Sequence, residues 1–162
     1  MFRFLGGLIA HSLILVKDYW RFKFAPLVWK QIIGDQLTLA DLEDMDYFSY
    51  QMLNNLKQKG SQLGEAEFSS SIDLNFTTVL SNGVQVELCT NGKDIKVTQA
   101  NLDQFIEQVT QARLNESAVQ IEAVKRGIKE CLDYPGRIFD LINWDQLEEE
   151  VCGEIKVETQ KL

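Results

Sequence analysis

The residues from Ile72 to Leu88 alternate between apolar and more polar side chains, and they lie in a chain whose other apolar residues keep helical spacing. A period of two is typical of a strand that buries one face. At the centre stands Asn82-Gly83, the pair preferred in two-residue type I′ hairpins because both central residues need a positive φ. A second pair, Asn91-Gly92, indicates that the hairpin extends toward a small antiparallel meander. The sequence therefore predicts an α+β fold that is mostly helical, with one small antiparallel β-hairpin or meander.

Start and stop signals divide the first third of the chain into short helices. The apolar residues from Phe4 to Val16 keep helical spacing, which predicts a first helix. Pro26 suits the first turn of a second helix, and Gly34 suits its end. Thr38 followed by Asp41 predicts the capped start of a third helix.

Similar reasoning places the remaining elements. A fourth helix is predicted from about Tyr47 to Lys57, and Asn143 with Gln146 predicts the capped start of the last helix. The segment from Gly60 to Ser71 is rich in Gly, Ser and Glu without a clear period, which predicts a loop.

Composition excludes several classes of function. A chain of 162 residues with 45% apolar content fits one domain with a real core. Its net charge of -8 argues against nucleic acid as a partner and favours basic proteins. The apolar run at the start contains His11 and Ser12 and is too short for a membrane span, so we expect no membrane association. The cysteine pattern favours a reducing compartment, the cytoplasm or the nucleus.

The residues that could carry chemistry are few. Cys89, Cys131 and Cys152 are widely spaced, and His11 is the single histidine, so neither a disulfide framework nor a metal site is indicated. A nucleophilic cysteine needs a base or a charged partner, and none is recognisable, so all three cysteines are predicted to be small buried apolar residues. No phosphate-binding loop or hydrolase motif is present, and we expect no cofactor and no catalytic residue in this chain.

An ordered series of landmarks carries a family resemblance. They are Phe2-Arg3-Phe4-Leu5-Gly6, Pro26-Leu27-Val28-Trp29-Lys30, Thr38-Leu39-Ala40-Asp41-Leu42, Leu114-Asn115-Glu116-Ser117, Arg126-Gly127 and Leu147-Glu148-Glu149-Glu150-Val151-Cys152-Gly153. In this order they resemble the amino-terminal lobe of a HECT-type ubiquitin-protein ligase over nearly all of residues 1–162. The second and third landmarks are most similar to the large HERC-type ligases.

The resemblance implies a function that this chain shares with parts outside it. Such ligases bind a ubiquitin-charged conjugating enzyme, accept ubiquitin on a cysteine of a carboxy-terminal lobe, and pass it to a lysine of a protein substrate. That cysteine stands in a Thr-Cys-Phe context that occurs nowhere here, so we expect the chain to be inactive alone. The resemblance also implies roughly a hundred upstream residues that cover the first helix, so apolar surface is expected there.

The resemblance assigns docking of the conjugating enzyme to a smaller subdomain of residues 46–117. The residues it implies for the docking groove are apolar in all but one case: Ser49, Leu53, Leu56, Leu74, Phe105 and Val109. Family members often carry a larger apolar residue at Ser49 and an aromatic one at Val109, which implies a shallower groove. From spacing alone, Leu53 with Leu56 and Phe105 with Val109 equally fit the buried face of any helix.

Two other functions remain open at this point. The chain could be a non-catalytic interaction module that binds or sequesters conjugating enzymes, or a compact α+β domain unrelated to ubiquitin. Binding to a conjugating enzyme separates the first two hypotheses from the third.

Overall fold

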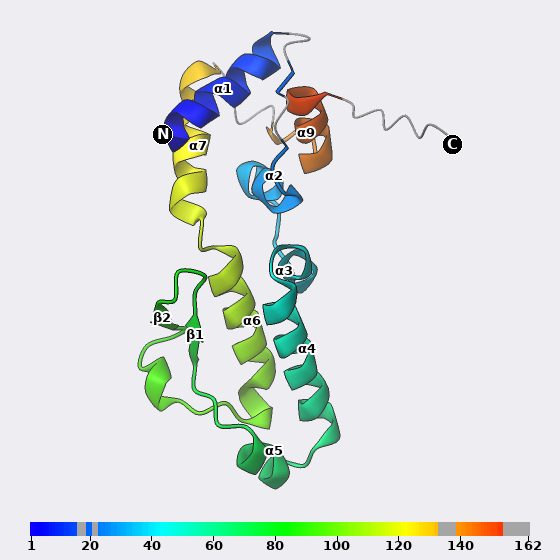
Figure 1. Cartoon of the computed structure of the whole chain (residues 1–162), viewed down its shortest axis with the longest axis vertical. Coiled ribbons are helices and arrows are strands. Elements are labelled where there is room, and N and C mark those ends of the chain that lie inside the picture. Colours follow the sequence, from blue (N-terminus) through cyan, green and yellow to red (C-terminus); the bar gives the residue numbers. More distant parts are fainter. Residues whose placement is uncertain (16–18, 21–22, 133–138, 154–162) are drawn as a thin grey trace, which may run out of the picture. The chain divides into compact units, whose positions relative to one another are not determined.

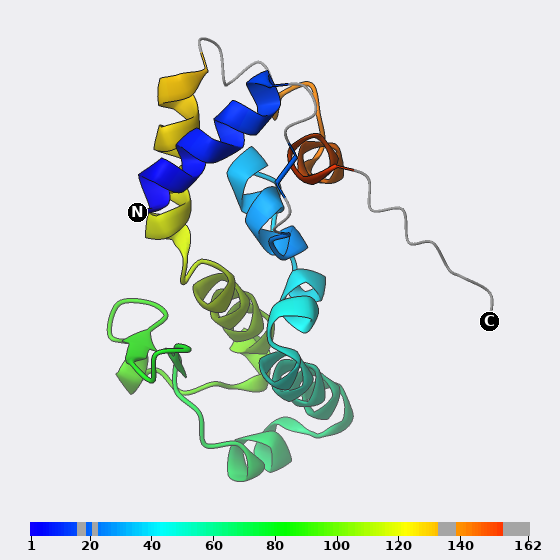
Figure 2. The ribbon, with the colours of Figure 1, turned by 45° about the horizontal axis from the view of Figure 1, so that its top comes forward.

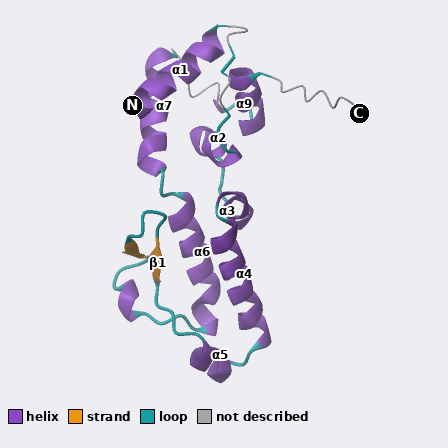
Figure 3. Cartoon of the chain, viewed as in Figure 1, coloured by secondary structure: helices purple, strands orange, loops and turns teal. Residues whose placement is uncertain are grey.

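The computed structural model describes residues 1–15, 19–20, 23–132 and 139–153 (Figure 1). The chain divides into two compact units, of which the first contains Met1–Gln36 and Ala118–Leu162 and the second contains Leu37–Ser117. The described part is mostly helical with a small two-stranded antiparallel sheet (Figure 3), which confirms the predicted α+β class.

The described part of the first unit contains the helices α1 (Phe2–Ile14), α2 (Pro26–Ile33), α7 (Ala118–Cys131) and α9 (Trp144–Cys152). In both Figure 1 and Figure 2, α1 crosses α7. The two helices approach closely because Gly6 and Gly127 face each other, and a Cβ at either position would collide with a backbone carbonyl oxygen of the other helix. Side chains from each of these described helices fill the core of this unit: Ile9, Ala10, Trp29, Ile32, Ile121, Val124, Ile128, Leu147 and Val151.

The helix ends in this unit follow the sequence signals. Pro26 is the first residue of α2, where its missing N–H costs no hydrogen bond. Gly34 ends that helix with φ 100°, a left-handed conformation that glycine adopts without strain. At α9, Asn143 and Gln146 cap each other's backbone N–H with bonds of 3.1 and 3.2 Å. All three predicted boundaries are confirmed.

The second unit contains α3 (Leu39–Met45), α4 (Tyr47–Gln62), α5 (Glu65–Ser71), β1 (Thr77–Val79), β2 (Gln85–Glu87) and α6 (Leu102–Leu114). Two short 3₁₀ helices, η1 (Gly92–Asp94) and η2 (Gln99–Asn101), connect the sheet to α6. Helices α4 and α6 lie side by side, and β1 packs against α6 (Figures 1 and 2). The buried apolar residues of the unit come from α3, α4, α5, α6 and the segments next to the strands: Leu42, Leu53, Leu56, Phe68, Phe76, Val97, Leu102, Phe105, Ile106, Val109 and Leu114.

The hairpin forms at the predicted place but with a different turn. Strands β1 and β2 pair in antiparallel register, with Val79 opposite Gln85. Residues Ser81, Asn82 and Gly83 form the loop, and only Gly83 has a positive φ, of 79°. The Asn82 side chain accepts a hydrogen bond from the Val84 N–H at 2.9 Å, which supports a three-residue loop with a left-handed glycine. The predicted two-residue type I′ turn is therefore wrong.

The third strand of the predicted meander is reduced to a single bridge between Asn75 and Lys96. Asn91 takes the left-handed conformation and leads directly into the 3₁₀ helix η1. A short helical turn therefore stands where the second Asn-Gly pair indicated the start of a third strand.

The predicted loop from Gly60 to Ser71 is also wrong, because α4 continues to Gln62 and α5 follows at Glu65–Ser71. Phe68 is fully buried and anchors α5, while Glu65 and Glu67 stand in its first turn, where the helix dipole favours negative charge. A helix this short with a single buried apolar residue has no repeated apolar spacing, so the sequence could not indicate it.

Candidate docking site

A groove of about 380 Å³ opens on the second unit between α4 and the segment that follows α5. Helix α4 contributes one wall, and residues at the end of α5 and just beyond it contribute the other. The lining residues are Met52, Asn55, Leu56, Lys59, Ser71, Ile72, Asp73 and Leu74.

The apolar lining of the groove is partly open to solvent. Leu56 is buried, while Met52 is 43% exposed and Leu74 is 38% exposed. A hydrogen bond fixes the backbone at Leu74, because its carbonyl oxygen accepts from the Val97 N–H at 2.8 Å. The groove therefore presents two accessible apolar side chains, with buried Leu56 lining the same groove.

Of the two charged residues that line the groove, Asp73 has an ion-pair partner and Lys59 has none among the described residues. The Asp73 carboxylate lies 3.0 Å from the Lys96 ammonium. Lys59 is exposed and makes no ion pair with any residue that the structure describes. An acidic group on a partner would find Lys59 available.

Of the six residues predicted for docking, the structure brings Leu56 and Leu74 together in this groove. Leu53, Phe105 and Val109 are buried in the core of the same unit. The Phe105 ring packs edge-on against Phe76, with ring centroids 5.5 Å apart. These three side chains pack in the core, which was the alternative that their helical spacing also allowed. They are not exposed to a partner and can affect binding only by supporting the surface residues that cover them.

Ser49, the sixth predicted residue, has a local partner. Its N–H and its hydroxyl both donate to the Asp46 carboxylate, at 3.1 and 2.5 Å. Asp46 is the N-cap of α4, so Ser49 helps to fix the start of that helix.

Met52, Asn55 and Lys59 are groove residues that the sequence reasoning missed. The signal was present in the sequence, because Met52 stands four residues before Leu56, and Asn55 stands four before Lys59. The pattern could not show which side of α4 faces solvent, and the apolar residues alone pointed to the buried side.

A buried arginine fixes the start of α4 to the rest of the unit. Arg113 on α6 lies 2.5 Å from Asp46 and 2.5 Å from Glu116, and it donates to the Val79 carbonyl oxygen at 3.2 Å. Glu116 in turn accepts hydrogen bonds from the Ser81 backbone at 3.0 and 3.1 Å. We call this set the Arg113 network; it joins α4, α6 and the hairpin.

The carboxyl of Asp46 responds to this environment. Burial alone would raise its pKa, but hydrogen bonds from Ser49 and the nearby Arg113 guanidinium outweigh burial and hold the pKa below its ordinary value. The folded protein therefore favours the charged carboxylate of Asp46 over the protonated one more than an isolated aspartate does.

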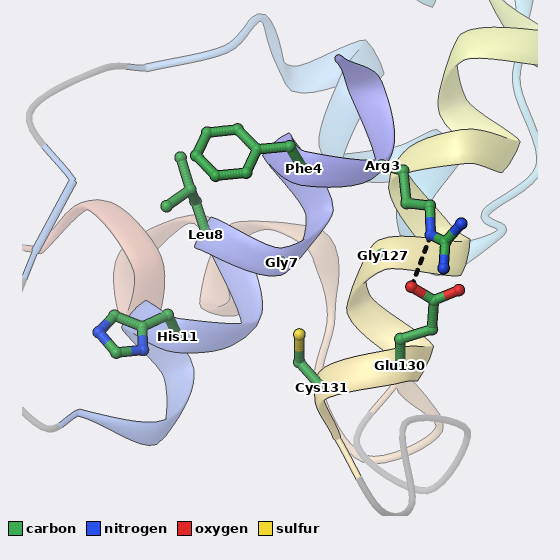
Figure 4. Close-up of a pocket in the computed structure, with 8 residues that line it drawn as sticks. All are labelled: Arg3, Phe4, Gly7, Leu8, His11, Gly127, Glu130 and Cys131. Atoms are coloured by element: carbon green, nitrogen blue, oxygen red, sulfur yellow. Dashed lines mark hydrogen bonds and ion pairs between the residues drawn. The ribbon is translucent and has the colours of Figure 1, made fainter.

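The first unit has a separate groove of about 610 Å³ between α1 and α7. Phe4 is exposed there, Leu8 is partly buried, and Arg3 and Glu130 form an ion pair of 2.6 Å at its edge (Figure 4). Phe4 is therefore an accessible apolar side chain on this face of α1.

Cys131 lies in the same groove and is exposed, so its predicted burial is wrong. The reason is its position in the last turn of α7, where the helix end leaves one side uncovered. His11 belongs to the opposite helix, and Figure 4 shows its ring directed away from the Cys131 sulfur. The pair therefore lacks the arrangement of a nucleophile with its base.

The other two cysteines are half-buried. Burial and the neighbouring Glu148 carboxylate raise the pKa of the Cys152 thiol, with Lys23 opposing them. A raised pKa disfavours the thiolate that nucleophilic attack needs.

Among the described residues, no group of three or more His, Cys, Asp or Glu side chains is arranged to hold a metal ion. None of the helices in the described ranges is long and apolar enough to cross a membrane.

Comparison with known proteins decides the family. The family model described as HECT-domain (ubiquitin-transferase) matches residues 1–162. The chain belongs to the HECT-domain family. A protein of Plasmodium falciparum named as an E3 ubiquitin-protein ligase is 34% identical over 143 residues, which is 86% of this chain.

Two human relatives carry the same designation. The E3 ubiquitin-protein ligase HERC2 is 29% identical over 153 residues, or 94% of this chain, and HECW1 is 27% identical over 161 residues, or 97%. The chain spans 1% of the Plasmodium protein, 3% of HERC2 and 9% of HECW1. HERC2 among these relatives supports the predicted similarity to HERC-type ligases within the HECT family.

Proposed function

We propose that the second unit of this HECT-domain chain docks a ubiquitin-charged conjugating enzyme in the groove between α4 and Leu74. The observation that carries the proposal is the groove itself, in which buried Leu56 lies beside accessible Met52 and Leu74. A few apolar anchors with a polar edge are typical of protein interfaces that form and dissociate readily.

The proposed docking region differs slightly from the predicted one. The compact unit Leu37–Ser117 contains the predicted subdomain of residues 46–117 and begins earlier, with α3. Assignment of docking to this subdomain stays a proposal, supported by family membership and by the position of the groove within the unit.

In the proposed sequence of events, docking brings the ubiquitin thioester of the conjugating enzyme toward a carboxy-terminal lobe outside this chain. A cysteine of that lobe attacks the thioester carbonyl, ubiquitin is transferred to its sulfur, and the thiol of the conjugating enzyme leaves. The amine of a substrate lysine then displaces that cysteine to form an amide. This chain's own residues bind and orient the enzyme but form no bond with ubiquitin.

The groove predicts modest affinity, with Kd in the range of about 1 μM or weaker, because few side chains are accessible. Calorimetric titration against a panel of conjugating enzymes tests this. Leu74→Asp should weaken binding at least tenfold, or about 1.4 kcal/mol, because a carboxylate would then have to be desolvated against Leu56.

Val84→Asp is the matched control, because Val84 is exposed in the same unit but lies outside the groove lining. Circular dichroism checks that both variants remain folded. Equal affinity of folded Leu74→Asp and wild type would refute the groove assignment.

A further inference from the structure

The most exposed aromatic side chain of the second unit's helices stands near the start of α4. Phe48 is 82% exposed. It precedes Met52 by four residues on the same helix, and Met52 lines the groove. Residues four apart on a helix lie on one face with Cβ atoms about 5–6 Å from each other. Phe48 and Met52 therefore form an apolar ridge, the α4 ridge, that continues the groove along the helix.

The start of α4 is held in place. Asp46 caps the helix and pairs with Arg113 at 2.5 Å, and Ser49 binds the same carboxylate through its N–H and hydroxyl. The backbone under Phe48 is thus fixed from both sides, at Asp46 and at Ser49. An exposed aromatic ring on a fixed backbone loses little conformational freedom on binding, which is what an interface anchor needs.

We propose that Phe48 is a second apolar anchor for the conjugating enzyme and determines which enzymes bind. This inference rests on the proposed function, and the partner is the same because the α4 ridge is continuous with the groove through Met52. From Leu56 to Phe48 the helix rises about 12 Å. An enzyme that binds tightly must therefore present two apolar contacts about that far apart, and one with a polar residue at the second position should bind more weakly.

Tyr47 provides a matched control. It is also aromatic, it is 62% exposed, and it is the neighbour of Phe48 on the same helix. Adjacent helical residues point about 100° apart, so Tyr47 lies off the ridge, where its hydroxyl accepts a hydrogen bond of 2.7 Å from Gln51.

The test is the affinity of wild type, Phe48→Ala, Phe48→Leu and Tyr47→Ala for a panel of ubiquitin-conjugating enzymes, measured by calorimetry with Leu74→Asp included. Phe48→Ala should weaken the tightest binders about tenfold and leave the weakest nearly unchanged, so that differences within the panel shrink. Phe48→Leu should retain most of the affinity, and Tyr47→Ala should bind like wild type. Thermal melts of the Phe48 and Tyr47 variants should coincide with that of wild type, because both side chains are largely exposed.

Two results would overturn the inference in different ways. If Leu74→Asp abolishes binding but Phe48→Ala binds like wild type, the groove docks the enzyme and the α4 ridge plays no part. If wild type binds no enzyme of the panel, the inference falls together with the proposed function.

Discussion

At the scale of residues, the Arg113 network is the largest group of charges in the second unit with little access to water. The Arg113 side chain is 10% exposed and neutralises Asp46 and Glu116 together. Arg113→Leu should lower the free energy of unfolding by about 2 to 3 kcal/mol, because it leaves two carboxylates close together without their cation. Urea denaturation measures this. Arg126→Leu, at an exposed position on α7, should change stability by less than about 0.5 kcal/mol, and a similar loss in both variants would contradict the account.

Asp46 gives the network a pH dependence with a defined sign. Its pKa in the folded state lies below the ordinary value of 3.8, so the folded protein favours the charged carboxylate more than the unfolded chain does. This contribution to stability is complete above the ordinary pKa and is lost as the pH falls through the lower folded pKa. Wild type should therefore lose stability below about pH 4 more steeply than Asp46→Asn does, as measured by urea denaturation from pH 7 to pH 3. Parallel curves for the two proteins would show that Asp46 contributes nothing.

The type of a residue alone could not show whether it lies in the docking groove or in the core. Leu53, Phe105 and Val109 have the apolar character that both a groove and a core require, and only the position of each side chain separates the two. Leu56 and Leu74 were predicted for docking and line the groove, while Met52 and Lys59 could be placed there only once the solvent-facing side of α4 was known.

At the scale of elements, the crossing of α1 and α7 depends on Gly6 and Gly127. Gly6→Ala should destabilise the protein despite alanine's helix propensity, because the added Cβ collides with the Val124 carbonyl oxygen. Backbone atoms cannot move aside without shifting the helix, so we expect a loss of about 1 to 3 kcal/mol. Gly7→Ala is the control on the same helix. Its Cβ would meet only the Cys131 sulfur at 3.6 Å, an ordinary contact, so this variant should gain up to about 1 kcal/mol.

Thermal melts of these two variants decide whether the crossing is close. Opposite shifts in Tm are expected. A Gly6→Ala variant at least as stable as Gly7→Ala would mean that the helices lie further apart than described.

The elements themselves were predictable to different degrees for physical reasons. Caps at Thr38 and Asn143 depend on bonds within a few residues, and both formed as the sequence indicated. The Asn82-Gly83 turn failed in detail because the Asn82 side chain bonds to the Val84 backbone, which favours a longer loop. Helix α5 was missed because its stability comes from burying Phe68 against other elements.

At the scale of the whole molecule, membership of the HECT-domain family raises the question of which cysteine carries ubiquitin. We expect none of Cys89, Cys131 and Cys152 to do so, because the His11 ring is directed away from the Cys131 sulfur, the pKa of the Cys152 thiol is raised, and Cys89 is half-buried. Incubation with activating enzyme, a conjugating enzyme and ubiquitin, followed by a non-reducing gel, should show no thioester on this chain. A reducible adduct mapped to any of these cysteines would contradict the expectation.

The central claim is that the groove between α4 and Leu74 receives the conjugating enzyme. The most direct measurement is NMR titration of the isotope-labelled chain with an unlabelled conjugating enzyme, followed through backbone amide shifts. The account predicts that the largest changes cluster at Met52 to Lys59 and Ser71 to Leu74, and that Leu74→Asp needs at least about ten times as much enzyme to produce them. Changes confined to α1 and α7, or equal changes in Leu74→Asp, would contradict it.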